Sequence, residues 1–445
     1  MSPFAAWILA QEARALLTRL AQVRPFALLE PMVPAAALLP GAQTAIEQHL
    51  LAGKRDVGAL VQGFLGWLGG PSARLATDAE AQRRFSFLRL RFNAVLTQFD
   101  LFNDVISQRS EHDTGVWMSG LDVVSADALT LAGSYYPVPP VICYLDRGIG
   151  AAIRRARTRL PGGGSNPVAI IRVPRERMVG SGIASSLIHE VGHQAAALLD
   201  LVDSLRPLLQ GMQRGSAADR EAWQLWARWI SEIVADFWSV ARVGICSTLG
   251  LMGVVSLPRP FMFRLNLDDP HPVPWIRVTL SCAIGQALYP HPQWARLAAL
   301  WQSLYPPQGL DPARLRLLDQ LRATMPAFVS LLVNHRPPRL RGKALHEALA
   351  VRERQPRRLA DLYRSWCRAP AGMYRAPPTL VFAVLGQSRV DGRLSPEAES
   401  ALLSKLLTHW ALRSTLDTAS ACRTAVLQRA TSRAWLESEH GLATR

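Results

Sequence analysis

The stretch Ser185-Ser-Leu-Ile-His189-Glu190-Val-Gly-His193-Gln194 decides how the centre of this 445-residue chain folds. It contains the pattern His-Glu-x-x-His. On a helix, residues four apart lie on the same face, so both imidazoles can reach one ion. Zinc commonly binds such ligands, at about 2.0–2.1 Å from the nitrogen. The pattern therefore predicts a helix over about residues 183–202 that carries two zinc ligands, His189 and His193.

Glu190 lies between the two histidines and would project beside the metal. Zinc lowers the pKa of a bound water toward about 7, and a neighbouring carboxylate can take its proton as the water attacks a carbonyl. Glu190 is therefore the expected general base. The alternative is a pair of solvated histidines on an amphipathic helix, but the neighbours of the histidines would bury most of this helix. These neighbours are Leu187, Ile188 and Val191. Buried histidines this close need a partner, and a metal is the simplest one.

A second predicted helix, at about residues 220–243, supplies the third ligand. Glu232 and Asp236 are four apart on an otherwise apolar face, where carboxylates are costly unless paired or bound to metal. Glu232 completes a His₂Glu set and leaves the fourth position for water. Asp236 can accept the remaining ring N–H of a zinc histidine and so fix its tautomer. The alternative for Glu232 is a salt bridge to Arg228 or Arg242.

These two helices together resemble those of the gluzincin metallopeptidases, in which His-Glu-x-x-His is followed by Glu-x-x-Ala-Asp. The resemblance implies that Asp236 orients His189. A third segment, residues 271–277, fits the pattern His-Pro-x₄-Arg of the minimal gluzincins and of the related CAAX-prenyl-protease-like and heat-shock membrane peptidases. In that group the segment lies by the active site, so His271 or Arg277 is expected to stabilise the developing oxyanion. The alternative is a proline-rich loop that enters a helix.

The resemblance covers about residues 165–305, a third of the chain. The membrane peptidases of the group have clear spanning helices, but no run here reaches the about 20 consecutive apolar residues that spanning requires. The substrate class is therefore not carried over. In gluzincins a strand before the first zinc helix forms the edge along which an extended peptide docks, and Val168–Val173 occupies that position. The alternative is an ordinary sheet strand.

The predicted fold is α+β and predominantly helical. We expect an N-terminal helical region at 1–118, a zincin-like metallopeptidase core with a small sheet at 119–305, and a C-terminal helical region at 306–445. Val141–Leu145 is a further strand candidate. The helical flanks match no known pattern, and could cover the cleft, recruit substrate or dock the protein to a larger assembly.

The composition limits the partners and the compartment. The net charge of +16 could steer the protein toward nucleic acid, an anionic membrane or an acidic partner. The alternative is an arginine bias from a GC-rich genome, with the charge spread over solvated faces. No dense basic block with interleaved aromatic residues is present, so there is no strong nucleic-acid signature. Five widely spaced cysteines argue against a disulfide framework. The first residues lack the basic segment of a signal peptide. We expect a cytoplasmic protein, with secretion by a non-classical route left open.

These observations predict a zinc-dependent metallopeptidase that hydrolyses a peptide bond in a protein or peptide, with water activated by Glu190. Two alternatives stay open. One is a non-catalytic or vestigial zinc protein that serves as a basic interaction module for nucleic acid, a membrane surface or a protein scaffold. The other is a bacterial effector or toxin peptidase delivered into another cell. Weaker candidates for a hydrogen-bond donor near the zinc are Tyr135, Tyr136, Tyr289 and His291.

Overall fold

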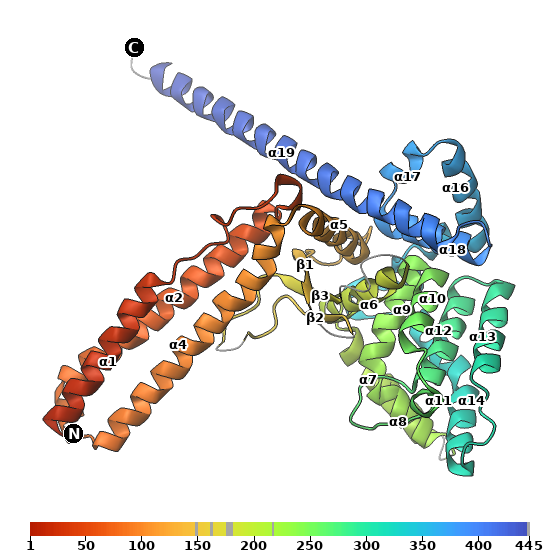
Figure 1. Ribbon diagram of the computed structural model, residues 1–445, viewed down its shortest axis with the longest axis horizontal. Helices are drawn as coiled ribbons and strands as arrows, with labels where there is room; N and C mark the ends of the chain where they lie inside the picture. Colours follow the sequence, from red (N-terminus) through yellow and green to blue (C-terminus); the bar gives the residue numbers. More distant parts are fainter. Residues whose placement is uncertain (147–149, 161–162, 175–180, 216–217, 443–445) are drawn as a thin grey trace. The chain divides into compact units, whose positions relative to one another are not determined.

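The fold was obtained as a computed structural model that describes residues 1–146, 150–160, 163–174, 181–215 and 218–442, without the side chains of 181–184 and 426–442 (Figure 1). It is mostly helical (73%) with a small three-stranded mixed sheet, which confirms the predominantly helical α+β class. No helix of the described part is long and apolar enough to cross a membrane.

The chain divides into two compact units, each described here by itself. Unit 1 contains residues 1–120, 156–168 and 407–445, and unit 2 contains residues 121–155 and 169–406. The boundary predicted near residue 118 falls close to the first division. Residues 306–406, predicted as part of a separate C-terminal region, belong to the same unit as the sheet.

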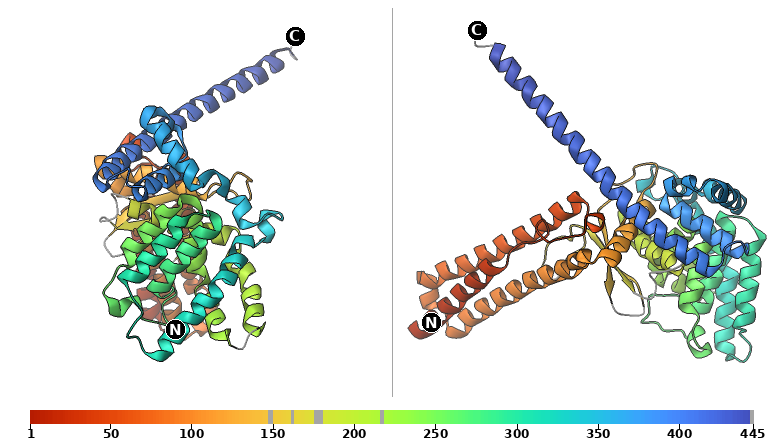
Figure 2. Two further views of the ribbon diagram at one scale, coloured as in Figure 1. Left: turned by 90° about the vertical axis from the view of Figure 1, so that its right-hand side faces the viewer. Right: turned by 45° about the horizontal axis from the view of Figure 1, so that its top comes forward.

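Unit 1 is built around three long helices that run side by side (Figures 1 and 2). They are α1 (Pro3–Gln22), α2 (Pro40–Gly69) and α4 (Asp78–Ser107), with the short α3 (Pro71–Leu75) between the last two. The Thr77 side chain caps α4 by accepting a hydrogen bond from the Glu80 amide. Apolar side chains at helical spacing form the shared core; those of α1 are Leu9, Ala13, Leu16 and Leu20.

Unit 2 contains the sheet, in the strand order β1-β3-β2. β1 (Val141–Asp146) and β3 (Ala169–Pro174) are parallel, whereas β2 (Ala152–Arg154) pairs antiparallel with β3. The structure confirms strands at both predicted positions. It also corrects one expectation, because β3 is the central strand. Both of its sides are already hydrogen-bonded, so an extended peptide cannot add to it.

Helices α6 (Ser181–Leu198), α9 (Ile230–Val243), α10 (Ile245–Val255) and α12 (Pro274–Leu288) surround the predicted site. The second predicted helix is interrupted at Trp229, which separates α8 (Arg220–Arg228) from α9. The remaining long helices of the chain are α5 (His112–Leu129), α7 (Leu201–Gly215), α13 (Pro292–Leu304), α14 (Pro312–Asn334), α16 (Pro356–Arg368), α18 (Pro378–Val390) and α19 (Pro396–Leu442).

A polar cluster lies inside unit 2, away from the predicted site. Arg242 and Arg354 are both buried, at 6% and 5% exposure. Arg354 donates to the Arg242 carbonyl at 2.8 Å and to Thr379 Oγ1 at 3.1 Å. Asp127 accepts from the Thr379 amide at 2.8 Å and lies 3.9 Å from Arg242 Nη2. Asp127 thus supplies a counter-charge for the buried guanidinium group of Arg242, and it links α5, α9 and α18.

Candidate metal centre

A close crossing of α6 and α9 positions the centre. Gly192 of α6 faces Ala235 of α9 so tightly that a Cβ at residue 192 would lie 2.8 Å from Ala235 Cα and 2.9 Å from its carbonyl oxygen. Such distances are too short for any side chain, because the obstacle is backbone. Gly192 is one of the two unspecified positions of His-Glu-x-x-His. It therefore lets the two helices approach closely enough for their ligands to meet.

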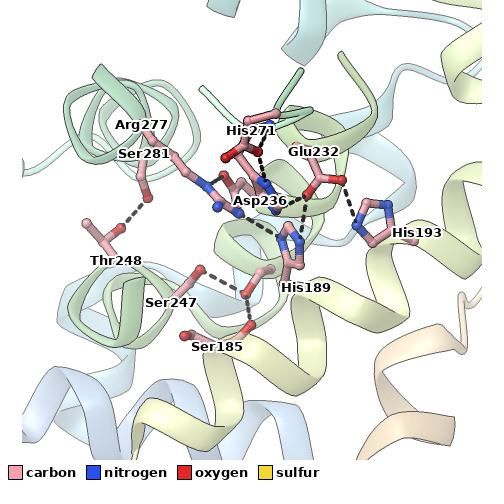
Figure 3. Close-up of polar contacts among 12 residues, drawn as sticks. Ser185, His189, His193, Glu232, Asp236, Ser247, Thr248, His271, Arg277 and Ser281 are labelled. Atoms are coloured by element: carbon pink, nitrogen blue, oxygen red, sulfur yellow. Dashed lines mark hydrogen bonds and ion pairs between the residues drawn. The ribbon is translucent and has the colours of Figure 1, made fainter. Parts of the chain in front are cut away.

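Three predicted ligands lie together at this crossing (Figure 3). Glu232 Oε2 is 3.2 Å from His189 Nε2, and Glu232 Oε1 is 3.4 Å from His193 Nε2. One ligand atom from each residue lies within 4.8 Å of the other two. The side chains are 11–15% exposed. The predicted alternative, a salt bridge from Glu232 to Arg242, is not formed, because Arg242 bonds to the Asp127 carbonyl oxygen instead.

The chemistry of this donor set fits zinc. In a tetrahedral site with bonds near 2.1 Å, ligand atoms lie about 3.4 Å apart. Each oxygen of Glu232 lies at about this distance from one of the two histidines, and the three ligand atoms lie within 4.8 Å of one another. Glu232 Oε2 is buried and has no well-directed hydrogen bond. A buried carboxylate oxygen without one is costly, and a cation between the ligands would satisfy it. His189, His193 and Glu232 would hold the ion.

Asp236 and Arg277 support His189 from behind. Asp236 Oδ1 lies 2.8 Å from His189 Nδ1. Arg277 donates two hydrogen bonds to the same carboxylate, from Nε to Oδ2 at 2.7 Å and from Nη2 to Oδ1 at 2.9 Å (Figure 3). An acceptor at Nδ1 fixes the tautomer whose Nε2 lone pair faces the ligand position. Arg277, predicted as an oxyanion stabiliser, is thus placed as a positioning residue for Asp236.

His271 reaches the centre from the segment before α12. Its Nε2 lies 3.1 Å from Glu232 Oε2, and its Nδ1 lies 2.7 Å from Asp269 Oδ1. The side chain is 44% exposed, so it can face both the ligands and an incoming molecule. The close carboxylates of Glu232 and Asp269 raise the pKa of His271, and their effect outweighs that of partial burial. A protonated His271 can donate to an oxygen that gains negative charge.

Glu190 opens into a pocket of about 130 Å³ beside the ligands. It is 8% exposed and makes no hydrogen bond or ion pair with any residue in the described ranges. The walls of the pocket come from α6, α9, α10, α12 and the residues before β2. The residues on these walls other than the site residues are Gly150, Ala151, Ser185, Ser186, Ser247, Leu251 and Val254. Glu190 is therefore available to a molecule held in the pocket.

Short side-chain contacts hold α10 against its neighbours. Ser247 donates to Ser239 of α9 at 2.8 Å, and Ser239 donates to the Ser185 carbonyl of α6 at 3.4 Å (Figure 3). The hydroxyl groups of Thr248 and Ser281 lie 2.7 Å apart and join α10 to α12. These contacts fix the wall of the pocket that faces Glu190.

The charges of the centre are strongly coupled. Burial lowers the pKa of His189, but Asp236 and the contact with Glu232 outweigh it and raise that pKa from 6.5 to about 9. Burial raises the pKa of Glu232, and contacts with three histidines hold it well below its usual range instead. Burial also raises the pKa of Asp236, but the charge of Arg277 outweighs burial and holds that pKa below its usual range. A proton and a metal ion therefore compete for the same imidazole nitrogen atoms of the ligands.

We expect the zinc affinity of chelator-stripped protein to rise between pH 6 and 8. Below a pKa of about 9, zinc must displace the His189 proton, so the affinity should rise up to about tenfold per pH unit for one proton released. The same proton stabilises the metal-free fold. Its contribution is fully present below pH 6.5 and is lost as the pH rises through about 9. Competition with a chromophoric chelator at three pH values measures the slope. A flat profile would contradict the prediction, and Asp236→Asn should weaken the slope.

The weaker candidates have other contacts. Tyr136 donates to the Leu129 carbonyl at 2.5 Å and Tyr289 to the Ala241 carbonyl at 2.6 Å, both in the core. His291 caps α13 through the Gln293 amide, and Tyr135 stacks against Arg341. Sequence reasoning missed Asp269 and Gly192. Asp269 could have been found from its position two residues before His271. Gly192 could have been found because a glycine inside a buried helix indicates close packing.

Comparisons of the chain with protein-family models, with curated proteins and with solved structures find no match. The conclusions about the centre therefore depend on its residues and their geometry.

Proposed function

We propose that this chain is a zinc-dependent peptidase with a zincin-like catalytic core. The observation that carries the proposal is that Glu190 lines the same pocket as His189, beside a convergent His₂Glu ligand set. Its carboxylate feels the charge of Arg277 but has no hydrogen bond or ion pair with a described residue. A structural zinc site has no need for an unpaired buried carboxylate, because such a group costs free energy. In a hydrolase the same carboxylate is the general base.

Each residue has a defined role in this proposal. Zinc, when bound, would polarise a carbonyl group and make a water molecule more acidic. Glu190 would take a proton from the attacking water and pass it to the leaving amine. His271 would donate a hydrogen bond to the carbonyl oxygen as it gains charge. Asp236, held by Arg277, would keep His189 in the ligating tautomer.

The pocket limits the side chain that fits beside the scissile bond. Its volume of about 130 Å³ is slightly smaller than the roughly 150 Å³ of an engineered cavity that accepts benzene. Leu251 and Val254 supply apolar surface, and Ala151 and Ser247 leave the space open. We infer a preference for small or branched aliphatic side chains at this position.

Metal content and peptide cleavage test the proposal. Wild-type protein purified without added metal should contain about one zinc per chain by mass spectrometry, and Glu232→Ala should contain far less. Glu221→Ala, an exposed glutamate of α8, should keep its zinc and serves as the matched control. Wild type should then cleave a peptide library beside aliphatic residues.

Two outcomes would contradict different parts of the proposal. A wild type that takes up no zinc after reconstitution would exclude the metal centre itself. A zinc-loaded wild type that cleaves nothing in the library would exclude the peptidase and leave a non-catalytic zinc protein, which is the predicted alternative.

A further inference from the structure

A groove runs between α2 and α4 on the surface of unit 1, with a volume of about 490 Å³. Aromatic and aliphatic side chains form most of its lining. Phe64 and Trp67 stack with ring centroids 5.7 Å apart, and Phe87 across the groove is 58% exposed. Exposed aromatic surface in a concave site is typical of protein-binding grooves.

Gly63 holds one wall of the groove open. A Cβ added there would meet nothing within 4 Å, and the same is true of Gly66 one turn further along. Both lie inside α2, where glycine is a poor helix former. No neighbour in the described part of the chain requires glycine at either position. The lack of a side chain at Gly63 leaves room for a partner backbone to approach α2 closely at the groove.

The charge at the rim is basic. Arg83 and Arg84 line the groove, and no acidic side chain does. Arg84 Cζ lies over the Trp67 ring, 4.2 Å from its centroid. The same side chain forms an ion pair with Glu80, with 3.1 Å between Nη2 and Oε1. Arg83 has no ion-pair partner among the described residues, so its charge faces outward. Arginine beside aromatic rings favours a carboxylate-bearing partner.

We infer that this groove binds an acidic amphipathic helix of another protein. A helix fits because the groove is concave and the glycine wall allows close approach, with apolar anchors at i, i+3 or i+4 and i+7. Acidic residues on its flanks would meet Arg83. A second copy of this chain fits poorly, because it carries a net charge of +16.

Selection from a displayed library of helical peptides about three turns long tests the inference, with the full chain as target. The solvent-facing positions of the library peptides vary among Glu, Lys and Ala. We expect the selected peptides to combine apolar anchor residues with glutamate. Their affinity, measured by fluorescence anisotropy, should fall at least about tenfold in Gly63→Leu, which fills the groove, and Arg83→Glu should shift the preference toward lysine.

The variants separate binding from folding. Leucine replaces glycine in a helix at a site with open space, so the thermal midpoint of Gly63→Leu should equal or exceed that of wild type. Gly41→Leu, also open and at the other end of α2, is the matched control and should bind as wild type does. Winners without acidic residues, or equal binding by Gly63→Leu, would overturn the inference. The inference would also be overturned if no peptide were selected and vesicles of phosphatidylglycerol and phosphatidylcholine bound to the groove instead.

Discussion

Glu190→Gln should lower kcat by about 10²–10⁴-fold while the protein keeps about one zinc per chain. The amide has nearly the shape of the carboxylate, so the pocket and the ligands stay in place. It cannot accept a proton, so the general base is lost. Glu190 has no hydrogen bond or ion pair with any described residue, so within the described part of the chain the substitution removes only its charge interaction with Arg277. Steady-state cleavage of a peptide from the library, with metal analysis of the same sample, measures both quantities.

The matched control for this experiment is Glu221→Gln on α8, whose side chain is exposed. It makes the same chemical change away from the centre and should leave kcat unchanged. If Glu190→Gln kept its activity with zinc in place, the role of general base would pass to another group. If it lost zinc as well, the carboxylate would act as a ligand rather than as a base.

Asp127→Ala should lower the free energy of unfolding by about 3 kcal/mol, because it removes the carboxylate counter-charge of the buried Arg242, which also feels the charge of Arg354. Burial and the neighbouring Arg354 already lower the pKa of Arg242 to about 10, and Asp127 is the charge that opposes this. The substitution also removes the acceptor of two Thr379 hydrogen bonds, from its amide and its hydroxyl. Urea unfolding followed by circular dichroism gives the difference.

Asp203→Ala provides the comparison, because the Asp203 side chain is 77% exposed and, among the described residues, forms an ion pair with Arg206 alone. It should change the free energy of unfolding by less than about 0.5 kcal/mol. Equal effects of the two substitutions would show that the cluster around Arg242 contributes nothing specific. A stabilising effect of Asp127→Ala would show that the arginines find other partners once the carboxylate is removed.

Local patterns in the sequence predicted the elements that carry the centre. The helix of His189 and the strands near residues 141 and 169 were found because hydrophobic periodicity and β-branched runs report local structure. The break at Trp229 was missed, since apolar spacing continues through it. β2 was also missed because it has only three residues, of which none is buried.

The arrangement in space was less accessible. The central position of β3 depends on pairing with strands elsewhere in the chain, which no local pattern reports. The contact of Arg277 with Asp236 was not predicted for a similar reason, because Asp236 lies 41 residues earlier on another helix. His189, His193 and Glu232 were identified because helical spacing and the cost of buried charge act within a few residues.

The contact at Gly192 restricts how this chain can vary. Every single-nucleotide change that turns a glycine codon into that of another amino acid adds a Cβ, and here a Cβ would overlap the Ala235 backbone. No substitution of Gly192 can therefore be accommodated without moving the helices apart, although the pattern His-Glu-x-x-His leaves that position unspecified. The crossing thus fixes a residue of α6 that no ligand chemistry would mark, and it is the backbone of α9 that fixes it.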